Sequence, residues 1–545
     1  MYMLLFSFFL MIMFLKLLIM KINIFIYWSM FMFLTFSMEY IIFIDWMMMI
    51  FIMVIMLISS MVMIYSMNYM ENEYYLNRFL ILILTFILSM IFMIISPNLL
   101  SILLGWDGLG LSSFCLIMYY QNKKSYYSSM VTILMNRIGD IFIIMISSIM
   151  LKLGSWNFLF INKFNYLLLF FNMLFSITKS AQIPFMKWLP MAMAAPTPVS
   201  SLVHSSTLVT AGIYLMIRFF YLLNNNFLWL IMIISIISMF MSGMSAMFEF
   251  DIKKIIAYST LSQLSMMFMT LSLKMTTLSF FHLINHAMFK SLIFLCSGII
   301  IHNYLNIQDI RKINMMNLNM PIIMIIFNIS SLTLCGMPFF TGFYSKDLII
   351  EMYIINNNNL FLIMFMYMCM ILTLLYSLRL MNYLNFNNFN NIYMNFYNLN
   401  NLMNNSIYLL MIMLLMFGCM MNWIFFNSLN FIILSNNYKL MINYLLIFFF
   451  IMFFMFLNIK INKIMFYYFN SMMYFFNNFK IFKLNLLIIS NKIIYLLEMN
   501  WIEYLILKNY NYLNKFMIMK KYMMNLKFMI ILMFFIYLMM IMFMM

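Results

Sequence analysis

The sequence predicts an all-α polytopic membrane protein, and two observations predict it: the composition and the length of the apolar runs. The chain has 545 residues, of which 67% are hydrophobic and only 8% are charged, whereas soluble domains contain about 25% charged residues. Apolar runs long enough to cross a bilayer, about 18 residues or more, recur from one end of the chain to the other. At roughly 30–35 residues for a span and its loop, we expect about 15–16 transmembrane helices.

The charges and the cysteines exclude several classes of function. The net charge of +17 is distributed over short loops, which is typical of membrane topology and does not indicate nucleic-acid binding. The five cysteines show neither CxxC nor Cys/His metal spacing, so the sequence predicts no zinc or iron–sulfur site and only inert, buried thiols. These cysteines are Cys115, Cys296, Cys335, Cys369 and Cys419.

Residues 1–79 are predicted to form N-terminal transmembrane helices. We expect two or three spans within 3–66, with Glu39 and Asp45 near the membrane interfaces. The polar, aromatic-rich stretch 67–79 is predicted to be a loop at the membrane surface, where tyrosine is favoured.

The stretch Thr178–Arg218 interrupts the apolar sequence with four of the seven prolines, two lysines and a histidine. Because proline removes a backbone donor, a helix must break here, and broken backbone survives in a membrane only where protein or a water-filled cavity covers it. A lysine at this depth, such as Lys179, is expected to face the interior of a helix bundle. Broken helix, buried base and His204 together indicate an ion pathway. The alternative is that Lys179 and Lys187 end a span and reach the headgroups.

A second break is predicted at Pro338 and Gly342, directly before Lys346 and Asp347. Corresponding breaks in two halves of a transporter indicate internal repeats. We therefore predict two inverted antiporter-like repeats, which cover residues 80–225 and 226–380.

Asp107 lies in the middle of an apolar span, among three glycines that would let helices approach closely. The glycine pattern G-x-x-G-x-G differs from the dinucleotide-binding pattern, and no strand precedes it, so we reject nucleotide binding. A carboxylate within a membrane helix is a candidate functional group. The alternative is an aspartate that caps a helix in a loop.

Two further sets of charged residues, one at 137–140 and one at 251–254, lie in predicted helices. Arg137 and Asp140 are three residues apart, so they can pair, although such a pair at the end of a span can also be an anchor. At 251–254, Asp251, Lys253 and Lys254 are expected at the membrane interface. Hydroxyl and amide residues continue a polar face inward from there, and polar residues within a membrane normally face protein or water.

His282, His286 and Lys290 are spaced at i, i+4 and i+8, so they lie on one face of a helix over two turns. A metal site would need further ligands, and none stands at a suitable spacing. Histidines that titrate near neutral pH suit a proton relay. The alternative is that both histidines make structural hydrogen bonds.

The last part of the chain changes character. We expect additional transmembrane helices in 381–457. Residues 458–526 mix recurrent lysines with Phe, Tyr and Leu, which predicts a long lateral amphipathic helix along the membrane or along neighbouring subunits. Residues 527–545 are predicted to form a C-terminal anchoring helix.

At these motifs the chain closely resembles the chain 5 family of NADH-ubiquinone oxidoreductase, the antiporter-like subunits of mitochondrial respiratory complex I, in an insect form. The motifs are spread over about half of the chain, and together they are highly specific. They are GWDGLGL at 105–111, NRIGD at 136–140, TKSAQ at 178–182, WLPMAMAAPTPVSSLVHSST at 188–207, DIKKIIAYSTLSQL at 251–264, HLINHAMFKSLIFLCSG at 282–298 and GMPFFTGFYSKD at 336–347.

The resemblance implies a proton channel driven by quinone reduction elsewhere in the complex. It implies no redox centre or cofactor in this chain, since NADH, FMN, iron–sulfur clusters and ubiquinone belong to partner subunits. It also implies a location in the mitochondrial inner membrane, beside other membrane-arm subunits and lipids. Many relatives have Glu where this chain has Asp107. The residues on which the family's proton pathway falls are Asp107 and its partner Lys179, the second acid Asp140, the relay His204, His282, His286 and Lys290, and the output Lys346.

Two other functions compete with this one. A multi-subunit cation/proton antiporter shares these motifs but has no link to redox chemistry. A purely structural scaffold would not need buried ionisable residues in both halves. The abundance of Met and Phe and the scarcity of Gly and Pro suggest the AT-biased coding of an organelle genome, which favours complex I.

Overall fold

The computed structural model divides the chain into two compact units, Met1–Met472 and Met473–Met545. Only the first unit is described below, because in the second all positions except Ser490 lie outside the described residues. The predicted lateral helix over 458–526 and the anchoring helix over 527–545 therefore lie outside the described part. The structure describes residues 2–33, 36–152, 154–158, 166–313, 320–356, 359–386 and 401–426, with scattered positions after 426.

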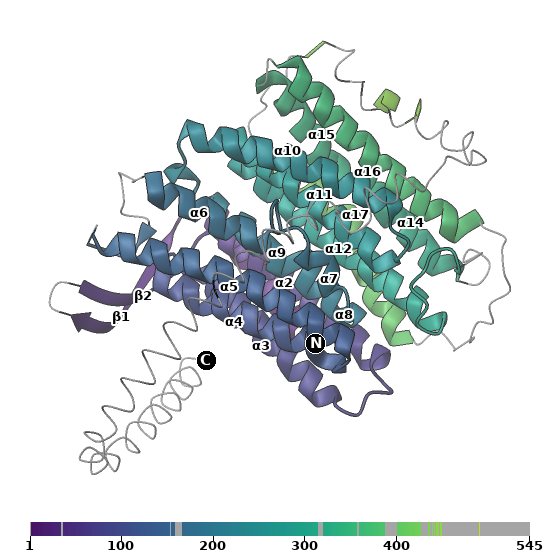
Figure 1. Ribbon diagram of the computed structural model, residues 1–545, viewed down its shortest axis with the longest axis horizontal. Helices are drawn as coiled ribbons and strands as arrows, with labels where there is room; N and C mark the ends of the chain where they lie inside the picture. The colour runs from purple at the N-terminus through teal and green to yellow at the C-terminus, as the bar shows by residue number, and fades with distance from the viewer. Residues whose placement is uncertain are drawn as a thin grey trace. The chain divides into compact units, whose positions relative to one another are not determined.

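The first unit is a bundle of membrane-length helices (Figure 1), which confirms the predicted polytopic helical fold. In the described residues, ten helices are long and apolar enough to cross a membrane. The helices of the first half are α1 (Tyr2–Met20), α2 (Trp46–Tyr69), α3 (Leu76–Ile95), α4 (Leu99–Ile117), α5 (Lys123–Leu151), α6 (Tyr166–Lys179), α7 (Trp188–Ala192), α8 (Thr197–Val199), the π-helical segment η3 (Ser200–Thr207) and α9 (Leu208–Arg218). Those of the second half are α10 (Asn225–Phe248), α11 (Ile252–Ser272), α12 (Thr276–Asn303), α14 (Pro321–Cys335), α15 (Thr341–Asn356), α16 (Leu360–Phe386) and α17 (Asn401–Phe425).

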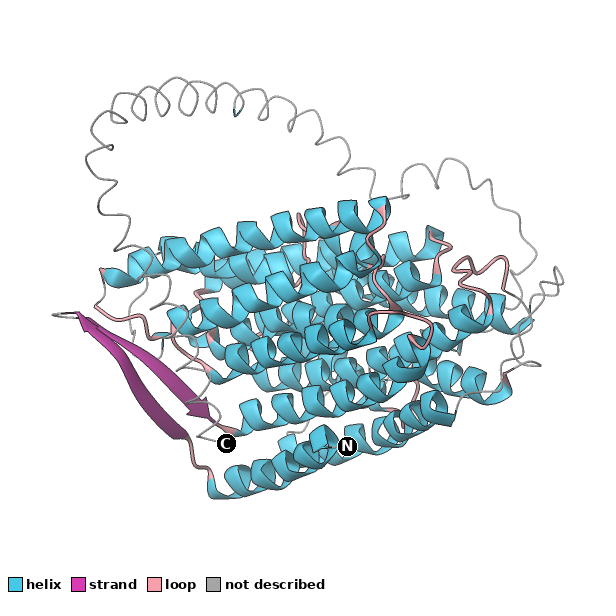
Figure 2. Ribbon diagram, turned by 90° about the horizontal axis from the view of Figure 1, so that it is seen from below, coloured by secondary structure: helices cyan, strands magenta, loops and turns pink. Residues whose placement is uncertain are grey.

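An antiparallel hairpin separates α1 from α2, and Figure 2 shows it at one end of the bundle. Its strands are β1 (Ile24–Phe33) and β2 (Phe36–Ile44). Two helical spans, α1 and α2, are present where two or three were expected within 3–66, whereas the strands between them were not predicted. Ile, Phe, Tyr and Trp favour strands, but a continuous apolar run does not reveal by periodicity whether it is helix or strand.

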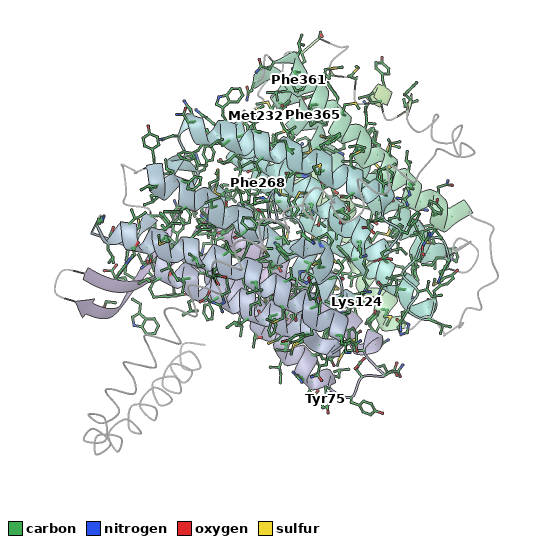
Figure 3. All side chains as sticks on the ribbon, in the orientation of Figure 1. Tyr75, Lys124, Met232, Phe268, Phe361 and Phe365 are labelled. Carbon is green, nitrogen blue, oxygen red and sulfur yellow. The ribbon has the colours of Figure 1, made fainter. Side chains whose placement is uncertain are left out.

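Two of the three glycines around Asp107 let the helices approach closely, as predicted, whereas a Cβ added to Gly110 would meet no atom within 4 Å. A Cβ added to Gly105 would lie 2.7 Å from the backbone nitrogen of Met93, and one added to Gly108 would lie 2.9 Å from Cβ of Ser89. Both contacts join α4 to α3. In the second half, α10, α11, α15 and α16 share an apolar cluster that includes Met232, and Phe365 packs against it; both residues are labelled in Figure 3.

Both predicted helix breaks are present. In the first, α6 ends at Lys179, and the chain continues through the short helices α7 and α8 into η3 and α9. In the second, α14 ends at Cys335, Gly336 adopts a φ of 87°, and α15 begins at Thr341. The breaks confirm the expected architecture, while the repeat boundaries at 80–225 and 226–380 stay a prediction.

Among the described residues, most of the basic side chains in or next to loops lie at one end of the bundle. We call it the basic end and give its residues at the end of this paragraph. Tyr119 Oη donates to the carbonyl of Tyr75, which joins the end of α4 to the start of α3. The rings of Tyr69 and His302 are 5.5 Å apart, which places the ends of α2 and α12 there too. Figure 3 labels Tyr75 and Lys124 on this side. The residues of the basic end are Arg78, Lys123, Lys124, Lys254, Arg311 and Lys312.

Candidate functional site in the interior of the helix bundle

Lys179 is fully buried at the last residue of α6, where the first break begins. Its ammonium donates a 2.8 Å hydrogen bond to the carbonyl of Trp106 and lies 3.7 Å from the centroid of the Trp106 ring. The side chain therefore faces the bundle interior, and the alternative that Lys179 reaches the headgroups is excluded. An ammonium held this way is stabilised by one carbonyl and an aromatic face instead of by bulk water.

Asp107, Arg137 and Asp140 form an ion-pair group beside Lys179. The Arg137 guanidinium lies 3.1 Å from the Asp140 carboxylate, which confirms the predicted pairing, and 3.6 Å from the Asp107 carboxylate. Within the described residues no ion pair joins Asp107 to Lys179, although a direct partnership was expected. The two acids, Asp107 and Asp140, instead share Arg137. Both carboxylates still act electrostatically on Lys179.

A close approach of α5 and α6 holds this group together. A Cβ added to Gly139 would lie only 2.4 Å from Oγ1 of Thr178, the residue before Lys179. Because Gly139 precedes Asp140, the contact fixes the acid next to the lysine. We refer to Asp107, Arg137, Asp140 and Lys179 as the first charged cluster.

His204 lies in η3, and its side chain is fully buried. Neither ring nitrogen has a hydrogen-bond partner among the described residues. Its ring meets the Trp188 ring edge to face at 6.4 Å, and Trp188 Nε1 donates to the carbonyl of Thr178 at 3.0 Å. Buried polar groups that lack a protein partner are usually satisfied by water, and π-helical turns are frequent at functional sites.

The predicted face of α12 is buried against α11 and α15. His282 Nδ1 lies 2.8 Å from Ser345 Oγ, and its Nε2 lies 3.2 Å from Gln263 Oε1. The Lys290 ammonium donates a 2.6 Å hydrogen bond to Ser259 Oγ. Ser259 and Gln263 belong to the polar face predicted for α11, so that prediction is confirmed.

His286, between His282 and Lys290, is fully buried and has no hydrogen-bond partner for either nitrogen among the described residues. His282 and His286 therefore differ: His282 is held by protein groups, whereas His286 has an edge-to-face contact with Phe289 at 5.4 Å. In the described part of the chain, no three His, Cys, Asp or Glu side chains gather closely enough to hold a metal ion.

Lys346 is buried at the second break. Its ammonium lies 3.3 Å from the carbonyl of Leu334, 3.4 Å from that of Cys335 and 3.0 Å from Thr373 Oγ1. The carbonyls at the end of a helix have no partner within the helix and carry partial negative charge, so a cation is stabilised there. Lys179 and Lys346 are thus both buried lysines beside interrupted backbone. We call His282, His286, Lys290 and Lys346 the basic row.

Sequence reasoning missed the burial of Lys253. It was expected at the interface, but it is only 5% exposed, and its ammonium donates a 3.1 Å hydrogen bond to the Ala195 carbonyl between α7 and α8. Lys254, by contrast, pairs with Asp251 at 2.8 Å and stays partly exposed, as expected. The signal that could have found Lys253 is its helical spacing of seven from Thr260, which places both on the polar face of α11.

A buried ion pair between Asp45 and Arg218 was also missed. Arg218 Nη2 donates to Asp45 Oδ1 at 2.6 Å, the second nitrogen contacts the other carboxylate oxygen, and Tyr214 Oη accepts from Arg218 as well. Asp45 additionally caps α2 by accepting from the backbone N–H of Met48 at 3.1 Å. It is therefore a buried structural residue, and the interface position expected for it is only part of its role.

The elements that carry the first charged cluster reach those that carry the basic row through the segment that contains His204: α5 packs against α7, and α6 packs against α9. α12 packs against α8, η3 and α9, and α11 packs against α7, η3 and α9. His204 in η3 therefore lies between the two groups along the packed elements. Lys179, Asp140, His204 and the basic row are buried and extend across both halves of the described bundle. The side chains of Asp107 and Arg137 are 34% and 45% exposed, so the first charged cluster is partly open on that side.

Comparison with known proteins identifies the family of this chain. Residues 96–373 match the family described as "NADH:quinone oxidoreductase/Mrp antiporter, TM", and residues 28–80 match "NADH-Ubiquinone oxidoreductase (complex I), chain 5 N-terminus". The chain is 48% identical over 428 residues to NADH-ubiquinone oxidoreductase chain 5 of Aedes aegypti, which covers 77% of this chain and 74% of that protein. This chain belongs to the NADH-ubiquinone oxidoreductase chain 5 family. The chain 5 protein of Locusta migratoria is 54% identical over 347 residues, 62% of this chain and 61% of that one.

Solved structures share the fold of this chain 5 family member. A chain of the Mrp complex from a Dietzia species aligns with a TM-score of 0.61 at 20% identity, over 84% of this chain and 57% of that chain. A chain of the membrane-bound sulfane sulfur reductase, an archaeal respiratory membrane complex, aligns with a TM-score of 0.64 at 20% identity, over 71% of this chain and 82% of that chain. At this identity the likeness shows the antiporter-like fold alone.

Proposed function

We propose that this chain is a proton-translocating membrane-arm subunit of respiratory complex I in the mitochondrial inner membrane. Electron transfer from NADH to ubiquinone takes place in partner subunits, which hold the FMN and the iron–sulfur clusters. This chain carries no redox centre and forms part of the translocase. Its partners are other membrane-arm subunits, especially a neighbouring antiporter-like subunit, together with membrane lipids.

The observation that carries the proposal is the pair of buried lysines, Lys179 and Lys346, each beside a helix break. A buried ammonium is costly, and the insertion cost of a lysine in mid-membrane is about 2.5–3.5 kcal/mol. A scaffold would gain nothing from two such groups. A proton carrier needs them, because a group held in a low-dielectric interior can change its protonation state when a nearby charge moves.

The first charged cluster supplies that nearby charge. A carboxylate close to a lysine stabilises the ammonium, and its withdrawal favours release of the proton. Arg137 competes with Lys179 for the carboxylates of Asp107 and Asp140, since it contacts both of them. In the proposed switch, Arg137 holds the two acids when Lys179 is to release its proton, and it yields them when Lys179 is to take one up.

The remaining groups give the proton a route. From Lys179 it passes to His204, then to Lys290, His286 and His282, and leaves through Lys346. A neutral imidazole takes a proton on one nitrogen and gives one up from the other. Ordered waters complete the steps at His204 and His286, whose nitrogens have no hydrogen-bond partner among the described residues.

Replacement of the lysines tests the proposal. Lys179→Met and Lys346→Met should lower the number of protons moved per NADH oxidised while the complex still assembles, because Met keeps the apolar stem and removes the titratable group. Lys152→Met is the matched control, since Lys152 is exposed at the end of α5. Normal coupling in both assembled buried-lysine variants would refute the proposed role.

The alternative is a subunit of a multi-subunit cation/proton antiporter, which the fold likeness to the Mrp complex supports. The two functions differ in their driving force. An antiporter would exchange a cation for protons in vesicles without NADH, whereas a complex I subunit would move protons only while NADH is oxidised.

A further inference from the structure

Two buried hydroxyl groups lie side by side between α2, α8 and α12, outside the proton route described above. Tyr65 on α2 and Thr197 at the start of α8 are both fully buried. Thr197 interacts with the hydroxyls of Tyr65 and Tyr69, but none of these contacts has full hydrogen-bond geometry among the described residues, so Tyr65 Oη and Thr197 Oγ1 both keep hydrogen-bonding capacity for a further partner. Because buried hydroxyls almost always have a partner, protein or ordered water, this pair fits a site that binds water.

Gly298 of α12 makes room for the two hydroxyls. A Cβ at this position would lie 2.4 Å from Tyr65 Oη and 2.8 Å from Thr197 Oγ1. Both distances are shorter than any ordinary carbon–oxygen contact, so any larger side chain would push into the hydroxyls. We call Tyr65, Thr197 and Gly298 the hydroxyl constriction.

On its outer side the constriction leads to the basic end. The Tyr65 ring stacks on Tyr69 with centroids 5.6 Å apart, and the Tyr69 ring contacts His302 at 5.5 Å. Tyr69 and His302 are half-buried, whereas Tyr65 is not exposed at all. Solvent exposure therefore rises from the fully buried Tyr65 to the half-buried Tyr69 and His302 at the basic end.

On its inner side the constriction leads to the basic row. Lys290, Phe294 and Gly298 follow one another at intervals of four on α12, so they lie along one ridge of that helix. Thr197 leads directly into η3, in which Ser201 and His204 are also fully buried. The constriction thus touches both elements that carry the relay groups.

We propose that the hydroxyl constriction is the inlet through which protons pass from water at the basic end to the buried relay. A hydronium ion on the outer side gives a proton to a hydroxyl oxygen and becomes water. The hydroxyl then passes its own proton to a water on the inner side, which becomes hydronium and carries the charge onward. Basic loops mark the side from which a membrane chain is inserted, which is the uptake side of an outward pump. This inference rests on the proposed function.

Isosteric removal of the hydroxyls tests the inlet in the assembled complex. Tyr65→Phe with Thr197→Val keeps the shape of both side chains, and the protons moved per NADH oxidised should fall by most of the amount that Lys346→Met removes, because protons from the inlet leave through Lys346. Thr197→Ser in place of Thr197→Val should raise the number of protons moved per NADH oxidised again, because serine returns a hydroxyl. Thr85→Val is the control. Thr85 lies on α3 and its hydroxyl makes a hydrogen bond at the exposed surface, so this substitution should leave the ratio unchanged.

A labelling experiment gives a readout that a structural role would not move. Thr197→Cys in the intact complex should react with a small water-soluble methanethiosulfonate added on the side of the basic end, beyond the labelling of the unmodified chain, and Gly298→Ala should slow that reaction. Absence of this extra labelling in Thr197→Cys, together with normal proton transfer in the double variant, would overturn the inlet. If Lys179→Met lowers the ratio in the same assay, the proposed function stands while the inlet fails; if it does not, both fail.

Discussion

Neutralising Asp45 should destabilise the junction of the hairpin, α2 and α9 by an amount that the structure allows us to estimate. The side chains of Asp45 and Arg218 are 8% and 13% exposed, and their contact is bidentate. Removing one partner of a buried ion pair leaves the other charge uncompensated and costs about 3–5 kcal/mol. Asp45 also caps α2, and loss of a capping side chain costs a further ~1 kcal/mol.

Two substitutions separate these contributions. Asp45→Asn keeps an oxygen that can cap α2 but removes the negative charge, whereas Asp45→Ala removes both. The assembled complex should survive heating least well with Asp45→Ala, better with Asp45→Asn and best with the unchanged chain. The measurement is the fraction of intact complex on native gels after heating at a series of temperatures.

A double variant makes the prediction specific to the pair. Arg218→Met alone should also destabilise, but Arg218→Met combined with Asp45→Asn should recover part of the loss, because no uncompensated charge is then buried. Additive losses in the double variant, or an Asp45→Asn complex as heat-resistant as the unchanged one, would refute the argument that the ion pair stabilises this junction.

Two further predictions concern a close contact and a loop. Gly139→Ala should destabilise the bundle by about 1–3 kcal/mol, because its Cβ would lie 2.4 Å from Thr178 Oγ1; heating on native gels checks this, and recovery by added Thr178→Ala would confirm the clash. Hydrogen bonds from Arg311 lower the pKa of Asp309 below its ordinary value; the shortest joins Arg311 Nη2 to Asp309 Oδ2 at 2.6 Å. That pair therefore stabilises the loop above about pH 4 and is lost as the pH falls through the lowered pKa. Hydrogen exchange of residues 304–313, corrected for intrinsic rates, should rise at acid pH in the unchanged chain but already be high in Asp309→Asn.

The features that the sequence could predict depend on local rules. Both helix breaks follow from proline and glycine chemistry, and the Arg137–Asp140 pair follows from spacing within one helix. The shared face of His282 and Lys290 follows in the same way. The hydrophobic composition was sufficient for the membrane class, because a span needs only length and apolarity.

The features that the sequence could not predict depend on contacts between distant segments. Asp45 and Arg218 are each an isolated charge at the end of an apolar run, and nothing local shows that they meet. Lys179 contacts the carbonyl of Trp106 instead of the Asp107 carboxylate, because the packing of α4 against α5 turns that acid toward Arg137. The hairpin was missed for another reason: its apolar residues lack the alternation that marks a half-exposed strand.

Native electrophoresis of gently solubilised membranes, with detection of this chain and an in-gel assay of NADH dehydrogenase activity, tests the central claim most directly. If the chain is a complex I subunit, it should migrate with a very large assembly that oxidises NADH and shows flavin and iron–sulfur absorbance. If it migrates in a smaller complex that lacks this activity and absorbance, the complex I assignment is contradicted, and cation-dependent proton exchange becomes the activity to measure.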